Sequence, residues 1–359
     1  MNHNLACRSK EQHGLRSARL LALAIGAAAS LIPGAALADE GGVSFWLPGL
    51  YGSLAAVPTG PGWSYFSFLY NTNVRGGADV ATAREITIGR FNPSLNINLN
   101  ASLNNDTAVM WINPSYAFAS PVLGGQLSLG MGGFVGYGTT SLSGTVTASI
   151  PPFGFVRSDS ISDNATGVGD LYPQASLKWH QGNNNFMIYG TGDIPVGTYS
   201  SSSLTNFGIG HGAADAGVGY SHLDQTTGHE FSAVAGFTYN LTNTHTNYQN
   251  GVDFHLDWGA SQYLSKQLFI GVVGYLYDQV SADSGSGDMV GPFESRVVGV
   301  GPQMGYLFPL GDMQGYLNLK GYGEFDAHDR LSGFNVWLTF AISPPAPTPS
   351  TTKTPMYHK

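Results

Sequence analysis

The sequence predicts an all-β protein, a single antiparallel transmembrane β-barrel of the bacterial outer-membrane kind. Three observations predict it: an export signal, a low share of charged residues, and segments in which apolar and polar residues alternate. Charged residues make up 11% of the 359 residues, against about 25% in a typical soluble domain. The mean hydropathy of −0.03 shows that apolar residues are diluted along the chain. Barrel strands produce such dilution, because only every second side chain faces lipid.

The first 38 residues have the pattern of a signal peptide. Four basic residues precede or begin an apolar stretch at 20–32, and Ala36-Leu37-Ala38 offers small residues for cleavage before Asp39. An uncleaved anchor helix is the less favoured alternative, because a spanning helix needs ~20 apolar residues. Cleavage would remove Cys7, the only cysteine, and with it any disulfide, thiolate metal site or cysteine nucleophile.

The mature chain is acidic. Without residues 1–38 it keeps 11 basic and 22 acidic residues, a formal charge of −11. Nucleic-acid binding is excluded on this ground, since it needs a basic surface. We expect no cofactor and no metal, because no phosphate loop or dinucleotide fingerprint follows a strand and no second cluster of ligands stands at metal spacing.

Period-two alternation is clearest between residues 313 and 325. The odd positions carry Met, Gly, Leu and Phe, whereas the even positions carry Gln, Tyr, Asn, Lys and Glu. Residues 171–180, 230–239 and 252–261 repeat the pattern. Strands have this period and helices do not, so we expect one face toward lipid and the other toward an enclosed aqueous lumen.

Short and long connections alternate, as in barrels with short periplasmic turns and longer outer loops. Counting back from a final strand at 333–341 gives eleven strands, the first beginning near Thr107. We expect a twelfth from residues 86–102, and 14 strands remain open because residues 63–71 also resemble a strand. The longest connection, at 140–168, is predicted to be an outer loop that restricts the bore.

Four regions follow from these patterns: a signal peptide at 1–38, an N-terminal plug or periplasmic segment at 39–62, the barrel at 63–342 and a Pro- and Thr-rich tail at 343–359. Residues 41–61 are rich in Gly and Pro and lack alternation, which makes them a poor wall strand. The tail cannot pair in a sheet and is predicted to be disordered. A soluble β-sandwich is the competing fold, but it would carry more charge on its outer face.

Four strings carry a family resemblance: EGGVSFWLPGLYGSLAAVP at 40–58, GDLYP at 169–173, NGVDFHLDWG at 250–259 and YLNLKGY at 316–322. With them the chain resembles, over nearly the whole mature sequence, the outer-membrane family named for a role in the meta-pathway of phenol degradation. The resemblance implies a transporter related to hydrophobic-compound channels of the long-chain fatty-acid type, in which an N-terminal plug sits in the barrel. The Pro-rich tail departs from that family pattern.

Three groups of side chains are candidates for lining the lumen. Asp253, His255 and Asp257 repeat on one face at steps of ~7 Å, as a polar ligand, proton or cation site would, although an ordinary polar wall is the favoured interpretation. Charged residues facing one another could sieve polar solutes or pair and seal the lumen. Inner aromatic residues could stack on a solute or pack together. The candidates are Lys178, Asp253, His255, Asp257, Arg296, Tyr316, Asn318, Lys320, Tyr322 and Glu324.

From these observations we expect passive uptake of a small hydrophobic or aromatic compound through the barrel. A structural or adhesive barrel with a filled lumen is the alternative, and a membrane-embedded hydrolase is a second. We expect no enzyme, because no motif such as G-x-S-x-G stands out among the Ser and His residues. The expected partners are outer-membrane lipid and the solute, and the oligomeric state stays open.

Overall fold

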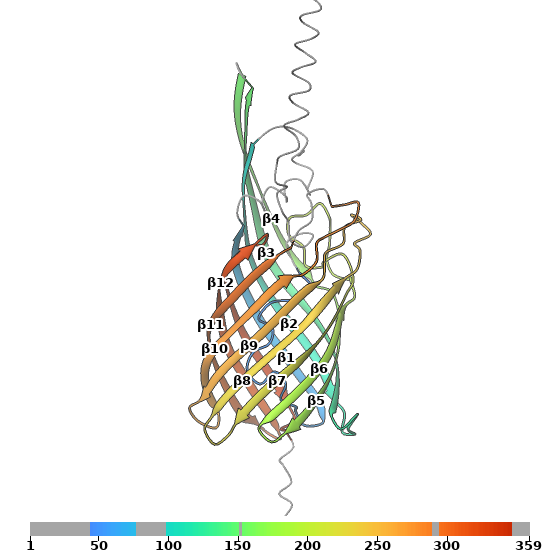
Figure 1. Cartoon of the computed structure of the whole chain (residues 1–359), viewed down its shortest axis with the longest axis vertical. Coiled ribbons are helices and arrows are strands. Elements are labelled where there is room, and N and C mark those ends of the chain that lie inside the picture. The colour runs from blue at the N-terminus through green and yellow to red at the C-terminus, as the bar shows by residue number, and fades with distance from the viewer. Residues whose placement is uncertain (1–43, 77–97, 151–152, 289–293, 347–359) are drawn as a thin grey trace, which may run out of the picture.

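The regular structure of the chain is one sheet of antiparallel strands that closes into a barrel (Figure 1). The computed structural model describes residues 44–76, 98–150, 153–288 and 294–346. No helix in these ranges is long and apolar enough to cross a membrane. The strands are β1 (Gly62–Gly76), β2 (Asn98–Ala117), β3 (Gln126–Ile150), β4 (Phe153–Val168), β5 (Tyr172–Gln181), β6 (Asn184–Asp193), β7 (Ala213–Asp224), β8 (His229–Asn240), β9 (Asp253–Tyr263), β10 (Leu268–Gln279), β11 (Arg296–Leu310), β12 (Met313–His328) and β13 (Ser332–Ser343).

Barrel closure depends on β1, which pairs with β2 on one side and with β13 on the other. Leu69 of β1, for instance, lies opposite both Met110 of β2 and Leu338 of β13. The other neighbours follow in chain order, with β3 joining β5, so that 12 strands close the ring. The predicted all-β barrel and its count of 12 strands are confirmed.

Strands β4 and β5 both pair with β3, each along a different part of it. The first residues of β3, from Gln126 to Gly132, pair with β5, whereas its later residues, from Val135 to Ile150, pair with β4. Residues 169–171 separate the two partners, and Asp170 there accepts hydrogen bonds from the N–H groups of Gly197 (2.6 Å) and Ile209 (2.8 Å). These bonds draw the connection between β6 and β7 against the break in the wall.

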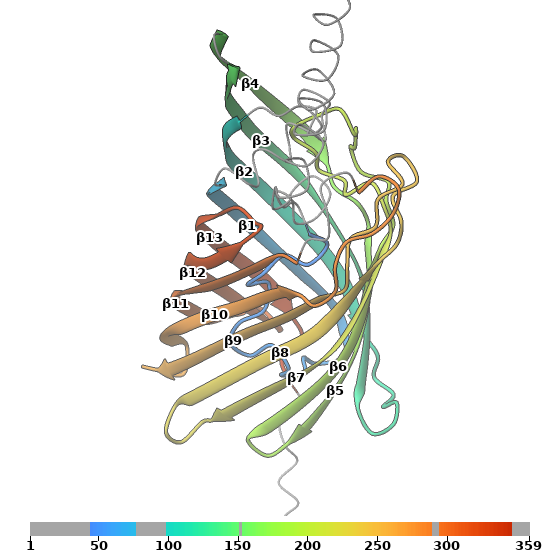
Figure 2. The same ribbon diagram turned by 45° about the horizontal axis from the view of Figure 1, so that its top comes forward.

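Two parts of the predicted strand assignment are wrong. The twelfth strand is β1, not residues 86–102: residues 98–102 begin β2, and residues 86–97 lie outside the described part of the chain. Residues 140–168 form most of a β3–β4 hairpin that rises beyond the rim instead of a loop that restricts the bore (Figures 1 and 2). The predicted signal peptide at 1–38 also lies outside the described residues, as do residues 347–359 of the predicted tail.

The hairpin was missed because its apolar residues do not form a continuous face: Leu142 is followed on the same face by Gly144, and Ile161 by Asp163. Its strands are joined by the ladder of backbone pairs and by hydroxyl contacts, such as Ser141 to Ser162 at 3.2 Å and Thr145 to Ser158 at 2.9 Å. Beyond the rim neither face meets hydrocarbon, so neither face needs apolar side chains. The apolar alternation that marks the wall strands is therefore interrupted in this pair.

The outer face of the wall is apolar. On β13 Leu338 is 44% exposed, whereas its chain neighbours Trp337 and Thr339 are buried. Met110 of β2 and Val300 of β11 are exposed in the same way. Apolar side chains that alternate with buried ones around a closed barrel form the surface that hydrocarbon requires, because a closed sheet pairs its backbone polar groups between strands.

Leu338→Arg should lower the free energy of unfolding by about 2–4 kcal/mol if this residue lies near the middle of the bilayer. Urea titration of the barrel in lipid vesicles, followed by heat-modifiable migration, measures the change. Leu123→Arg is the matched control, because Leu123 is 86% exposed in the turn between β2 and β3. Equal stability of the two variants would contradict the assignment of the outer face to lipid.

Candidate functional site

Residues 44–61 run inside the barrel before β1 begins, and we call them the plug (Figure 2, blue). The plug has no strand pairing and folds through turns, with Leu50 N–H donating to the carbonyl of Leu47 at 3.1 Å. Gly49 has a φ of +87°, and a Cβ there would stand 3.0 Å from the rings of Tyr275 and Tyr322. Glycine is required at this position both by the backbone conformation and by the closeness of the wall.

Two buried wall charges hold the middle of the plug. The Asp257 carboxylate on β9 accepts hydrogen bonds from the N–H groups of Gly49 (2.8 Å) and Tyr51 (3.0 Å). The Lys320 ammonium on β12 donates to the carbonyls of Gly49, Leu50 and Tyr51, the last two at 3.1 and 3.4 Å. Both charges are thus met by peptide dipoles of the same three residues, which compensates their removal from water.

The second half of the plug is fixed by hydroxyls and by Glu230. Ser53 Oγ lies 2.8 Å from Ser261 Oγ of β9, and the side-chain amide of Gln303 on β11 donates to Ser53 Oγ at 2.7 Å. The N–H of Leu54 donates to the Glu230 carboxylate on β8 at 2.9 Å.

The end of the plug is tied to two further strands. The N–H of Ala56 donates to Ser221 Oγ of β7 at 2.9 Å. From the opposite wall, Lys178 of β5 donates to the carbonyls of Ala55 (2.9 Å) and Val57 (3.3 Å). Most of these bonds come from the arc of wall between β7 and β12.

Aromatic stacking positions the beginning of the plug. The indole of Trp46 lies flat on the imidazole of His255, with ring centroids 3.5 Å apart and an angle of 12° between the planes. His255 Nε2 in turn lies 2.9 Å from Asp215 Oδ2 and 3.3 Å from the Tyr189 hydroxyl. The imidazole is therefore held rigidly, which fixes the position of the indole that covers it.

Burial, together with the nearby Asp215 and Asp257 carboxylates, raises the pKa of Tyr51 in the plug above its ordinary value. The phenol consequently stays protonated and neutral. The charges that face the plug are those of the wall.

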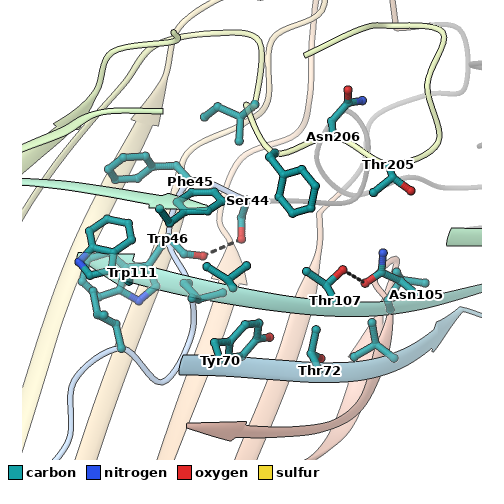
Figure 3. Close-up of a pocket in the computed structure, with 18 of the residues that line it drawn as sticks. Ser44, Phe45, Trp46, Tyr70, Thr72, Asn105, Thr107, Trp111, Thr205 and Asn206 are labelled. Atoms are coloured by element: carbon teal, nitrogen blue, oxygen red, sulfur yellow. Dashed lines mark hydrogen bonds between the residues drawn. The ribbon is translucent and has the colours of Figure 1, made fainter. Parts of the chain in front are cut away.

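An apolar cavity of about 220 Å³ lies above the plug. Its lower side is made by plug residues 44–47 and Leu50, and its roof by residues 204–207 and Ile209 of the β6–β7 connection. Figure 3 shows Tyr70 and Thr72 of β1, with Asn105 and Thr107 of β2, directed into the space below Asn206. The lining contains eight aromatic residues, namely Phe45, Trp46, Phe68, Tyr70, Trp111, Phe134, Tyr172 and Phe207.

A second cavity of about 260 Å³ also lies against β1, β2 and β3, toward the other end of these strands. Hydroxyl and amide groups contribute much of its lining, and Lys178 is its charged residue. The polar lining residues include Thr59, Ser64, Asn113, Ser115, Gln126, Ser128, Gln174, Ser176 and Thr191. We call the two spaces the upper and lower cavities.

The structure separates the predicted lumen residues into groups with different partners. Asp257, Lys320 and Lys178 bind the plug, as described above, and the Tyr322 hydroxyl lies 3.3 Å from the Gly49 carbonyl. Among the ten candidates only Glu324 lines the upper cavity.

The other candidates bond within the wall. Asp253 accepts a hydrogen bond from Asn240 at 2.8 Å, and Asn318 donates to Gln303 at 3.3 Å. Tyr316 stacks on Phe269 with ring centroids 6.3 Å apart. Asp253, His255 and Asp257 thus serve three separate contacts, and no group of three ligands that could hold a metal occurs in the described residues.

Arg296 does not join the buried charges. It forms an ion pair with Asp326 at 3.1 Å, and both side chains are 44% exposed. The ladder between β11 and β12 shifts register between Arg296 and Val298. Alternation counted from the middle of the strand therefore does not give the direction of this side chain.

The aromatic residues of the upper cavity were missed by sequence reasoning. Phe68 and Tyr70 lie in β1, which the sequence predicts only as an additional strand, and Trp111 lies in β2, where the prediction rests on the connections and not on alternation. Phe66, Phe68 and Tyr70 alternate with Ser67, Leu69 and Asn71. Aromatic rings at every second position of a strand were the signal in the sequence that could have predicted an aromatic lining here. No local pattern predicts Phe207, because the fold of a long connection brings it over the lumen.

A closed 12-stranded barrel with an apolar outside, a polar inner wall and an internal plug defines an outer-membrane β-barrel. The profile of the family described as "Putative MetA-pathway of phenol degradation" matches residues 93–340. The chain belongs to this family, as its sequence predicted. The matched region begins after the plug and β1.

Solved structures of outer-membrane proteins are similar to the chain at low identity, and the first of those that follow shares its overall fold. An outer membrane channel from Pseudomonas putida F1 is 12% identical, with a TM-score of 0.53 over 83% of this chain and 99% of the other. A FadL homologue from Pseudomonas aeruginosa is 10% identical, with a TM-score of 0.37 over 87% and 98%. The transport unit of the autotransporter AIDA-I from Escherichia coli is 9% identical, with a TM-score of 0.40 over 84% of this chain and 94% of the other. No curated protein matches the chain.

Asp257→Ala should loosen the plug, because the N–H groups of Gly49 and Tyr51 lose their acceptor, at a cost of about 1–3 kcal/mol for each buried donor. We expect a larger single-channel conductance in planar bilayers. Asp224→Ala is the control, since Asp224 accepts a hydrogen bond from Thr226 in the exposed β7–β8 turn. A conductance equal to that of the wild type would contradict the anchoring role of Asp257.

Proposed function

We propose that the chain is a passive outer-membrane channel for small, neutral hydrophobic or aromatic compounds. The observation that carries the proposal is the upper cavity, an aromatic-lined space inside a barrel whose wall is otherwise polar. Its volume of about 220 Å³ suits a compound of one or two rings. An apolar cavity of about 150 Å³ in another protein binds benzene.

The charged residues of the upper cavity favour a neutral solute, because both are engaged with the protein. The Glu324 carboxylate accepts hydrogen bonds from the Tyr275 hydroxyl (2.6 Å) and the Gly333 N–H (2.8 Å). The Arg330 guanidinium donates to Ser44 Oγ at 3.2 Å and lies 4.3 Å from the centroid of the Tyr277 ring. Binding an ionised solute would compete with these contacts.

The family and the fold support the same proposal. The family description names a pathway of phenol degradation, and a channel of Pseudomonas putida F1 has the same overall fold. Aromatic catabolism needs a route for its substrates across the outer membrane. We propose transport without catalysis, because the cavity is lined by rings, hydroxyls and amides and the carboxylate and guanidinium in it are already bonded.

The alternative is a structural barrel whose lumen is filled. The many hydrogen bonds between plug and wall favour it. Uptake of labelled naphthalene separates the two, in a Gram-negative strain that lacks its own hydrophobic-compound channels and carries or lacks this chain. Faster uptake with the chain supports the channel. Equal uptake by the two strains, with the barrel shown to be folded in the outer membrane, would rule the channel out.

Trp111→Ala should weaken naphthalene binding about tenfold, because the indole supplies a face of the cavity and a lost aromatic contact is worth about 0.5–1.5 kcal/mol beyond its buried area. Isothermal titration of the purified barrel in amphipol measures the dissociation constant. Trp63→Ala is the control, since Trp63 is 67% exposed on the outside of β1. Equal affinities of the two variants would place the binding site elsewhere.

A further inference from the structure

We infer that the plug is a fixed part of this channel and that the solute passes beside it, along the wall formed by β1, β2, β3, β5 and β6. The inference rests on the proposed function and adds the route and the residues that narrow it. The alternative is a plug that leaves the lumen to open it. Three observations favour the route beside the plug.

The first is the asymmetry of the plug's attachments. Asp257, Ser261, Glu230, Ser221 and Lys320 bond the plug from strands between β7 and β12. Both cavities lie on the other side of the plug, against the wall that begins at β1. The side between β7 and β12 thus supplies most of the bonds to the plug, whereas the side that borders the two cavities bonds it through Lys178 of β5.

The second observation is that the upper and lower cavities are neighbours that share four lining residues. Trp46, Leu50, Gln174 and Thr191 line both of them. Trp46 and Leu50 belong to the plug, whereas Gln174 of β5 and Thr191 of β6 lie directly opposite each other in the sheet. These four residues form a throat between plug and wall.

The third observation is that the plug side of the throat is held and the wall side is built into the barrel. Trp46 is fixed by its stack on His255, and the Leu50 carbonyl accepts a hydrogen bond from Lys320 at 3.1 Å. Thr191 Oγ1 donates to the Pro173 carbonyl at 3.0 Å. Rotamer changes of Leu50 and Gln174 can open such a throat, without breaking the buried bonds that displacement of the whole plug would break.

The chemistry of the route changes at the throat. Above it the solute meets aromatic rings, and below it hydroxyl and amide groups of residues such as Ser115, Ser128 and Ser176. A compound bound to the rings therefore leaves toward a polar, hydrated space. The throat residues would decide how wide a solute can pass, and we assign the size limit of the channel to Leu50 and Thr191.

A disulfide between plug and wall tests whether the plug moves. Ser53 Oγ and Ser261 Oγ are 2.8 Å apart, so cysteines at these positions are within reach of each other. Neither residue belongs to the lining of the two cavities. Cells with the oxidised S53C/S261C barrel should take up labelled naphthalene at the rate of the same cells treated with reductant. Loss of uptake on oxidation and its recovery on reduction would overturn the inference.

Bulky residues in the throat test the route itself. Thr191→Trp should lower naphthalene uptake at least about tenfold by filling the throat from the wall side. Leu50→Trp should do the same from the plug side, and it leaves the wall sequence intact should T191W fail to fold. Gly323→Trp is the control, because a side chain there meets open space on the outer face of β12. Unimpaired uptake by a folded throat variant would show that the solute takes another route.

The wild type separates this inference from the proposed function. If the wild-type chain does not accelerate naphthalene uptake, the proposed function fails. If it does, and the oxidised S53C/S261C barrel does not, the proposed function stands and only the fixed plug is wrong.

Discussion

The lumen of this barrel depends on one interaction, the capture of residues 49–51 between two buried wall charges. The Asp257 carboxylate accepts hydrogen bonds from N–H groups of this stretch, and the Lys320 ammonium donates hydrogen bonds to its carbonyls. The ammonium of Lys320 also lies 4.8 Å from the centroid of the Trp337 ring. Either charge alone in a dry lumen would be costly, and a plug without them would leave its peptide groups unpaired. Wall and plug therefore stabilise each other.

The hydrogen bonds between wall and plug are unevenly distributed around the barrel, which divides its interior into two halves. Between β7 and β12 the inner side chains include rings such as Tyr275 and Tyr322, together with the hydroxyls, the carboxylates and the Lys320 ammonium that reach the plug backbone. From β1 to β3 they include large rings such as Phe68 and Trp111, which stack with 5.7 Å between centroids and have little to offer a peptide group. The plug therefore lies closer to the strands that supply most of its hydrogen bonds. The opposite side keeps the open volume on which the proposed transport depends.

Alternation predicted the barrel because lipid constrains the outside of nearly every wall strand, from Met110 to Leu338. The same rule placed Lys320 and Asp257 on the inner face, but it could not reveal what they bind. Their partners are backbone groups of residues 49–51, and a peptide group has no sequence signature. The β3–β4 hairpin does not stand out in the sequence because its strands extend beyond the rim and their apolar face is interrupted, as where Ile161 is followed by Asp163. Arg296, next to a register shift, pairs with the partly exposed Asp326 instead of with the plug.

Hydrogen exchange of the plug amides tests the central claim most directly. Peptides covering residues 44–61 would be followed by mass spectrometry in lipid nanodiscs, with and without naphthalene. If the wall charges hold the plug in place, the amides of Gly49, Tyr51, Leu54 and Ala56 exchange as slowly as those of the wall strands, and naphthalene does not speed them. Rapid exchange in the free barrel, or on addition of naphthalene, would show that the plug is not fixed and would contradict the account.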